Sequence, residues 1–100
     1  MTIDELRRRI DQLDERLVEL LNERAHFALE IGKLKKTLGL EVYQPDREAA
    51  VLHHVRTHGK QTGSPLEGDA IVRVFERIID EARRIERATA HTSAGNGEDR

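Results

Sequence analysis

Apolar side chains recur every three or four positions through most of the first 38 residues. The recurring positions are Leu6, Ile10, Leu13, Leu17, Leu20, Leu21, Ala28, Ile31 and Leu34. This spacing places them on one face of an α-helix. Thr2 and Glu5 have the spacing of a capping box, and Gly39 suits the residue that follows a helix C-terminus. Because no proline occurs before Pro45, the sequence predicts one uninterrupted helix over residues 3–38.

Two further helices are predicted in the rest of the chain. Pro45 and Asp46 suit a first helical turn, and the pattern that they open ends near His58 and Gly59. A second capping box, Ser64-Pro65-Leu66-Glu67, has proline at the first helical position. The apolar positions that follow it are Ile71, Val74, Phe75, Ile78, Ile79, Ala82 and Ile85. No strand pattern is present, so the predicted fold is all-α, with one very long helix and two shorter ones.

The last twelve residues differ from the rest of the chain. They are small and polar and include two glycines, so we expect a helical domain over 1–88 and a polar disordered tail over 89–100. Inside the long helix, Gly32 costs up to about 1 kcal/mol relative to alanine. It indicates either a close packing contact or a tolerated glycine, and the pattern alone does not decide.

The length of the first helix predicts a dimer. Some 35 residues of helix span about 50 Å, whereas a compact chain of 100 residues has a radius of gyration of about 13 Å. Two shorter helices do not cover an apolar stripe of that length. A second copy of the chain, related by two-fold symmetry, is the simplest way to bury it.

Composition excludes several classes of protein. The 17 lysines and arginines nearly balance 19 aspartates and glutamates, which leaves a net charge of −2 and no basic surface for nucleic acid. No apolar run reaches membrane-spanning length. The chain has no cysteine, and its first residues are charged where a signal peptide would be apolar. We therefore expect a cytoplasmic protein that binds neither nucleic acid nor membrane.

Arg24 and Lys35 occupy positions of the long helix where apolar residues are expected. They are eleven residues apart, which places them within about 20° of one face and roughly 16 Å apart along the axis. Two cations on a core-facing stripe call for an anion between them. The alternative is that each extends to solvent from the edge of the stripe or pairs with a carboxylate such as Glu30.

Other charged positions allow two interpretations. Arg7 lies about 100° around the helix from Arg24, so it would reach the Arg24 face only from the other chain of a dimer. On its own it fits a solvated surface charge. Asp46, Arg47 and Glu48 likewise fit ordinary charges in a first turn.

The histidines do not indicate a metal site. His54 and His58 have helical i, i+4 spacing, but no third ligand is evident. Neither a metal nor a cofactor is therefore expected.

Several ordered strings of residues together resemble the all-helical chorismate mutase family. They are Leu6-Arg7-Arg8-Arg9-Ile10-Asp11-Gln12-Leu13-Asp14, Leu20-Leu21-Asn22-Glu23-Arg24, Ile31-Gly32-Lys33-Leu34-Lys35, Asp46-Arg47-Glu48, and Phe75 with Ile78-Ile79. The resemblance covers about residues 3–88. It implies an intertwined helical homodimer with two active sites that converts chorismate to prephenate, on the route to phenylalanine and tyrosine.

The resemblance also assigns roles to individual residues. Arg24 of one chain and Arg7 of the other match the family's carboxylate-binding arginines. Lys35 matches the lysine that contacts the ether oxygen of the breaking bond. Arg47 and Glu48 match the pair in the second helix, where Glu48 accepts a hydrogen bond from the substrate hydroxyl.

Three positions depart from the commonest family pattern. Gln44 stands where Asp or Asn is frequent, and Ala82 replaces a residue that is often Ser. Glu86 matches a position occupied by Gln or Glu that faces the ether oxygen. Because an ionised carboxylate would repel that oxygen and a protonated one could donate to it, we expect faster turnover at mildly acidic than at neutral pH. Glu86→Gln should flatten this profile.

The chemistry of the reaction agrees with the residues that the sequence offers. Chorismate is a dianion, which suits convergent cations. Its rearrangement is an intramolecular [3,3] shift, so catalysis needs only orientation of the substrate and stabilisation of charge on the ether oxygen. Two alternatives stay open: an isochorismate pyruvate lyase on the same scaffold, and a non-catalytic dimeric helical module that binds a partner helix. The second does not explain cations on an inward face.

Overall fold

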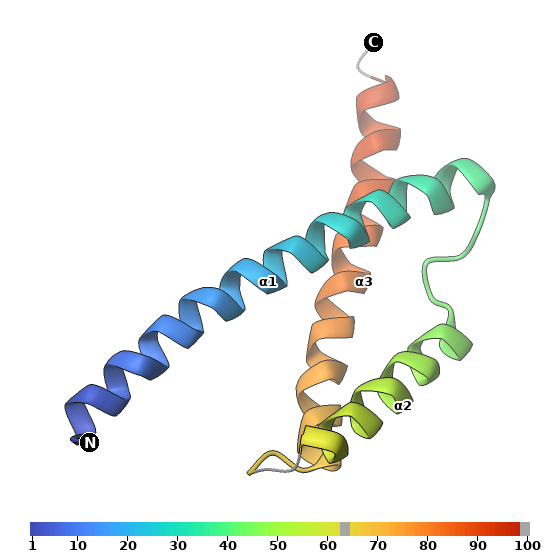
Figure 1. Ribbon diagram of the computed structural model, residues 1–100. Coiled ribbons are helices and arrows are strands. Elements are labelled where there is room, and N and C mark those ends of the chain that lie inside the picture. The colour runs from blue at the N-terminus through green and yellow to red at the C-terminus, as the bar shows by residue number, and fades with distance from the viewer. Residues whose placement is uncertain (63–64, 99–100) are drawn as a thin grey trace.

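Three helices make up the regular structure of the chain (Figure 1). The computed structural model describes residues 1–62 and 65–98. Helix α1 runs over Ile3–Leu38, α2 over Pro45–Thr62 and α3 over Gly68–Glu98. Within the described ranges there is no strand. The predicted all-α fold with one very long helix is confirmed.

Both predicted ends of α1 are confirmed by their backbone contacts. The Thr2 hydroxyl accepts a hydrogen bond from the Glu5 amide at 3.1 Å, and the Glu5 carboxylate accepts one from the Thr2 amide at 3.2 Å. At the other end Gly39 has a φ of 71°, in the left-handed region that glycine adopts without strain. The Leu40 amide then donates to the Lys35 carbonyl at 2.8 Å, which closes the last turn.

The predicted limits of the two other helices need correction. Helix α2 continues past His58 to Thr62, because Gly59 packs against α3 instead of ending the helix. A Cβ at Gly59 would lie only 3.1 Å from Cγ1 of Ile71. Helix α3 begins at Gly68, not at Pro65, and its first backbone hydrogen bond joins the Ile71 amide to the Glu67 carbonyl at 3.0 Å. Ser64, the predicted cap, lies outside the described residues.

Helix α3 also runs further than predicted. The predicted helix end at residue 88 is wrong, since the backbone stays helical to Glu98 through most of the segment predicted as a disordered tail. Thr89 shows how the helix continues. Its side chain is buried, and its hydroxyl donates to the Ile85 carbonyl at 2.8 Å. The division of the chain into a domain and a tail stays a prediction.

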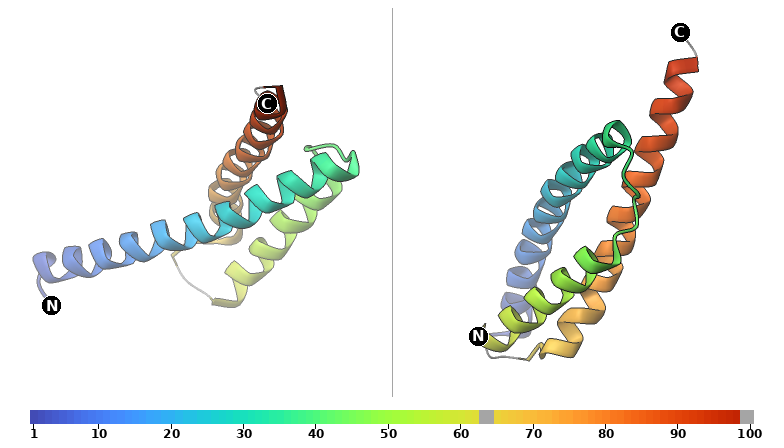
Figure 2. Two further views of the ribbon diagram at one scale, coloured as in Figure 1. Left: turned by 90° about the horizontal axis from the view of Figure 1, so that it is seen from above. Right: turned by 90° about the vertical axis from the view of Figure 1, so that its right-hand side faces the viewer.

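Helix α3 holds the structure together. It packs against both α1 and α2, whereas α1 and α2 make no backbone contact with each other in the described ranges. Figure 2 shows α1 crossing α3 at an angle while α2 runs beside the first half of α3. The resulting shape is long and thin, with extents of 59 × 29 × 14 Å and a radius of gyration of 17.3 Å.

Little of the apolar surface is covered within one chain. Among the described residues the buried apolar side chains are Ala28 and Ile79. The N-terminal half of α1 leads away from the other helices (Figure 1). Its exposed large apolar residues are Ile3, Leu6, Ile10, Leu13, Leu17, Val18, Leu20 and Leu21. In the described part of the chain no helix combines the length and hydropathy needed to cross a membrane.

Candidate active site

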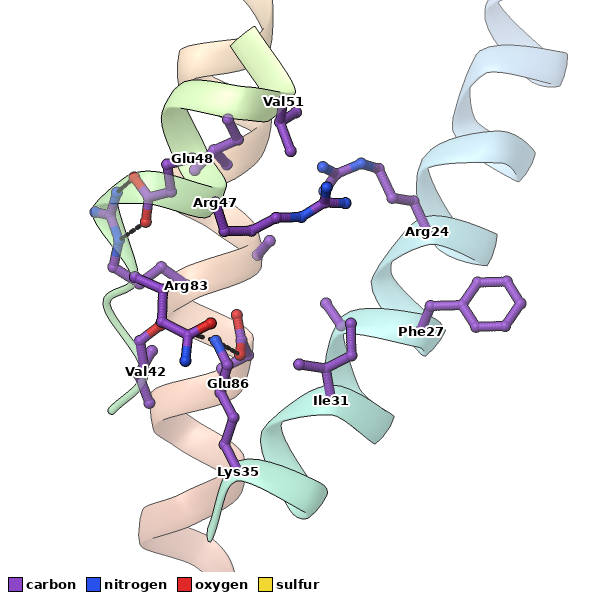
Figure 3. Close-up of a pocket in the computed structure, with 14 residues that line it drawn as sticks. Arg24, Phe27, Ile31, Lys35, Val42, Arg47, Glu48, Val51, Arg83 and Glu86 are labelled. Carbon is purple, nitrogen blue, oxygen red and sulfur yellow. Dashed lines mark hydrogen bonds and ion pairs between the residues drawn. The ribbon is translucent and has the colours of Figure 1, made fainter. Parts of the chain in front are cut away.

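A cavity of about 410 Å³ lies between the C-terminal half of α1 and the start of α2, with α3 as its floor (Figure 3). Its lining residues come from all three helices and from the segment that joins α1 to α2. They are Arg24, Phe27, Ala28, Ile31, Lys35, Val42, Gln44, Arg47, Glu48, Val51, Ile79, Ala82, Arg83 and Glu86. This is the volume of an ordinary small-molecule site.

The cavity gathers most of the residues singled out from the sequence. Those that line it are Arg24, Lys35, Gln44, Arg47, Glu48, Ala82 and Glu86. The inference that Arg24 and Lys35 share one face of a helix is therefore confirmed. Arg7 does not line the cavity, because it lies on the exposed N-terminal half of α1. The catalytic and binding roles of all eight residues stay predictions.

Lys35 and Glu86 form a close ion pair at one end of the cavity. The Lys35 ammonium lies 2.7 Å from Oε1 of Glu86, and these side chains are only 12% and 11% exposed. The same ammonium donates a hydrogen bond to the Val42 carbonyl at 2.9 Å. Oε1 of Glu86 is buried and accepts no directed hydrogen bond from the described residues, among which Lys35 supplies the cation that balances its charge.

Gly32 allows this ion pair to form. It lies one turn before Lys35 on α1, facing α3. A Cβ added at Gly32 would lie 3.0 Å from Cα of Glu86 and 3.3 Å from its Cβ and Cγ. Alanine would therefore push against the backbone of α3 at the residue that pairs with Lys35. The close-packing interpretation of Gly32 is confirmed.

Arg24 and Arg47 approach each other from opposite walls of the cavity. Figure 3 shows their guanidinium groups pointing toward one another, Arg24 from α1 and Arg47 from the first turn of α2. Within the described residues neither forms an ion pair with a carboxylate. Two like charges that converge without a counter-ion favour an anion between them.

Arg83 was not predicted from the sequence. Its Nε donates to Oε2 of Glu48 at 3.1 Å and its second amino group donates to Oε1 at 2.6 Å. Donation of these hydrogen bonds to the Glu48 carboxylate raises the pKa of Arg83 above its usual value. The spacing gives a partial signal, because Arg83 is three residues before Glu86 on α3, but it does not indicate the contact with Glu48 on α2.

The lining as a whole is cationic. Four cationic side chains stand against two carboxylates, which leaves a formal charge of +2 in the cavity. Both carboxylates are already paired, Glu48 with Arg83 and Glu86 with Lys35. Among the described residues that line the cavity, the charges without a carboxylate partner are those of Arg24 and Arg47, so the cavity suits a ligand with two negative charges.

No cysteine, serine, threonine or histidine is among the described residues that line the cavity. The rings of His54 and His58 stack on each other with centroids 6.5 Å apart. Over residues 1–62 and 65–98, no group of three or more potential metal ligands comes together. The described lining residues can thus bind and orient a ligand through their charges and their apolar contacts.

Comparison with known proteins assigns the chain to a family. A sequence model described as chorismate mutase type II matches residues 6–87, a range that includes all the candidate site residues, Arg7 among them. The chain belongs to the chorismate mutase type II family. The resemblance inferred from the sequence is confirmed.

Curated relatives of this chorismate mutase family are longer proteins. The bifunctional chorismate mutase/prephenate dehydratase of Neisseria gonorrhoeae is 41% identical over 90 residues, covering 86% of this chain and 24% of that protein. The protein of the same description from Pseudomonas aeruginosa is 40% identical over 86 residues, covering 81% and 23%. The T-protein of Haemophilus influenzae is 34% identical over 80 residues, covering 80% and 21%. The chain therefore spans about a quarter or less of the length of these relatives.

A solved structure in the family has nearly the same size as this chain. The chorismate mutase (form II) of Thermus thermophilus superposes with a TM-score of 0.80 at 29% sequence identity, covering 85% of this chain and 93% of that one. The three-helix arrangement is thus common to both chains.

Proposed function

We propose that this chain is a chorismate mutase that converts chorismate to prephenate by an intramolecular [3,3] rearrangement. The observation that carries the proposal is the pair of unpartnered guanidinium groups, Arg24 and Arg47, that converge in a cavity beside the buried ammonium of Lys35. Membership of the chorismate mutase type II family supports the same activity. The reaction needs no nucleophile and no cofactor, and we propose none.

The substrate would be bound through its two carboxylates. A guanidinium group presents a planar fork of donors that matches a carboxylate, so Arg24 and Arg47 can each hold one end of a dianion. Holding both ends favours the folded conformation in which the two carbons that bond lie close together. Such orientation contributes by removing the entropy cost of reaching that conformation.

Lys35 would stabilise the transition state. As the carbon–oxygen bond breaks, negative charge develops on the ether oxygen, and the Lys35 ammonium can donate to that oxygen in a site with little water. Its present contacts with Val42 and Glu86 hold it in place from two sides. Glu86 would contribute a hydrogen bond to the same oxygen when its carboxyl group is protonated.

We propose that the enzyme is a homodimer in which each cavity receives Arg7 from the other chain. The exposed apolar stripe along the N-terminal half of α1 supports a partner, because burial of one Leu or Ile side chain contributes roughly 1.5–3 kcal/mol. Arg7 lies on this half of α1, away from its own cavity. A second copy that packs along the stripe could bring its Arg7 to the Arg24 side of the cavity.

The product would serve the synthesis of phenylalanine and tyrosine. Relatives that pair chorismate mutase with prephenate dehydratase in one protein support this route. The present chain matches about a quarter of those proteins, so a second activity is not part of the proposal. A cytoplasmic location is proposed on the absence of cysteine from the sequence.

The test is loss of chorismate absorbance with purified protein, with the product identified by chromatography. Formation of prephenate above the spontaneous rate is expected. Release of pyruvate from isochorismate, with no prephenate from chorismate, would favour the lyase instead. A folded protein with neither activity would leave the non-catalytic helical module.

A further inference from the structure

Glu48 forms a bidentate ion pair with Arg83, which belongs to another helix. Glu48 is in the first turn of α2 and Arg83 is in the middle of α3, 35 residues further along the chain. Both oxygens of the carboxylate accept, at 3.1 Å and 2.6 Å. Each side chain is 22% exposed, so the pair is largely withdrawn from water. Such a fork is shorter, stronger and more directional than a single ion pair at the surface.

Arg83 is itself held from two other directions. Its guanidinium lies over the ring of Tyr43, 5.3 Å from the ring centroid, in the segment that joins α1 to α2. Its other amino group lies 3.3 Å from the Asp80 carboxylate, one turn earlier on α3. An arginine with an aromatic face and two carboxylates around it has few other positions to adopt.

The arrangement leaves Glu48 free to accept from the cavity. An ionised carboxylate has about four lone-pair sites, and the fork uses two of them. In Figure 3 Arg83 reaches Glu48 from the side away from Arg24. The remaining lone pairs can therefore face a ligand held between Arg24 and Arg47.

We propose that Arg83 is a positioning residue, which holds the Glu48 carboxylate in one orientation so that it accepts a hydrogen bond from the substrate hydroxyl. This inference rests on the proposed chorismate mutase activity. Arg83 acts through Glu48 and does not itself bind the substrate. The contact between α2 and α3 thereby sets the orientation of the Glu48 carboxylate, which belongs to α2.

The rival interpretation is that Arg83 competes with the ligand for Glu48. In that case its removal would raise activity, because Glu48 would be released to the cavity. The same removal lowers activity if Arg83 positions Glu48. The two interpretations therefore predict changes in activity of opposite sign when Arg83 is removed.

A double-mutant cycle tests the proposal. Four proteins are compared: wild type, Arg83→Gln, Glu48→Gln and the double variant. For each, kcat and KM for chorismate are measured, and the affinity for prephenate is measured by calorimetry, which needs no turnover. Arg83→Gln should lower kcat/KM and prephenate affinity about tenfold, the size expected for one hydrogen bond to a charged group. In the Glu48→Gln background the same change should cost less than about twofold, because nothing is left to position.

Arg84→Gln is the matched control. Arg84 is the next residue on α3, is 74% exposed in its side chain and makes only an i, i+3 ion pair with Glu81 at 3.4 Å. Its removal takes the same charge from the same helix, and kcat/KM should stay within about twofold of wild type. Arg83→Lys keeps the charge but loses the fork, so it should recover only part of the loss.

Three kinetic results would overturn the proposal. The first is a rise in kcat/KM on Arg83→Gln, which would show competition. The second is an equal loss with and without Glu48, which would show that Arg83 acts on the substrate or on the fold. The third is an equal loss in Arg84→Gln, which would show a general effect of charge.

Urea unfolding of the same four proteins separates failure of this inference from failure of the proposed function. If wild type neither turns over chorismate nor binds prephenate, the proposed function is wrong, whatever the role of Arg83. A coupling between positions 48 and 83 in the free energy of unfolding would still show that the ion pair forms in solution. Absence of that coupling in an active enzyme would overturn the inference alone.

Discussion

The two halves of α1 belong to the same continuous helix but have opposite surroundings. Its C-terminal half lies against α3, contains the buried Ala28 and Gly32 and carries Lys35 in a closed ion pair. Its N-terminal half leads away from α2 and α3, and its apolar residues are about half exposed (Figure 1). One chain therefore gathers most of the candidate site residues while leaving its apolar stripe uncovered. The C-terminal half of α1 thus carries most of the candidate site, and the N-terminal half carries Arg7 and the stripe that the proposed dimer would bury.

The largest expected effect comes from the C-terminal half. Lys35→Ala should lower kcat roughly 100- to 1000-fold, because it removes the donor to the ether oxygen and leaves Glu86 as an uncompensated buried carboxylate. Steady-state kinetics on chorismate measure this. Lys33→Ala is the control, since Lys33 makes only an exposed pair with Glu30 at 3.4 Å. Comparable losses in both variants would remove Lys35 from the mechanism.

Mixing two inactive variants tests whether Arg7 of one chain and Lys35 of the other belong to the same site. Arg7→Ala and Lys35→Ala should each be nearly inactive as pure proteins. After they are unfolded together and refolded, about a quarter of the sites should recover, because random pairing gives that share of intact sites. Activity per site is measured, with heterodimers verified by mass spectrometry. Verified heterodimers without recovery would place Arg7 outside the partner's site.

Two glycines, Gly32 within α1 and Gly39 directly after its end, separate activity from stability. Gly32→Ala should lower kcat roughly tenfold, because its Cβ would displace the backbone at Glu86 and shift the ion pair with Lys35. Gly39→Ala instead strains a residue with a φ of 71° and has open space around it. It should cost about 1 kcal/mol of unfolding free energy and leave kcat unchanged. Kinetics and urea unfolding on both variants check the contrast, and a kcat unchanged in Gly32→Ala would contradict it.

The smallest expected effect is that of pH. Turnover should be several-fold faster at mildly acidic than at neutral pH, because only protonated Glu86 donates to the ether oxygen, and Glu86→Gln should flatten the profile. The groups that face Glu86 are the Lys35 ammonium and, through it, the Val42 carbonyl. Arg83 does not titrate in this range, because a guanidinium group is protonated far above neutral pH and its hydrogen bond to Glu48 raises its pKa further. A wild-type kcat that does not change over that range would exclude this role for Glu86.

What the sequence predicted well depends on contacts between near neighbours in the chain. The capping box at Thr2, the left-handed Gly39 and the shared face of Arg24 and Lys35 all follow from helical periodicity. The family resemblance then added Gln44, Arg47, Glu48, Ala82 and Glu86, which line the same cavity.

What the sequence missed depends on how one helix packs on another. Gly59 resembles a helix end in sequence, yet it lies inside α2 because α3 passes close to it. Arg83 resembles a surface charge, and only the packing of α2 on α3 brings it to Glu48. The start of α3 at Gly68 and its extension beyond residue 88 were likewise not apparent from local signals. Gly32 allowed two interpretations until the position of Glu86 was known.

The thickness of the chain has a consequence for how the protein behaves on dilution. Its shortest extent of 14 Å corresponds to no more than two packed helices, whose axes lie about 8–10 Å apart. Every helix therefore has a face on solvent, and one chain has almost no interior of its own. If the proposed dimer supplies that interior, folding and catalysis both obey mass action. Specific activity and melting temperature would then fall together as the protein is diluted. The concentration at which they fall would be set by the affinity of the two chains for each other along the α1 stripe, and not by the affinity of the cavity for its ligand.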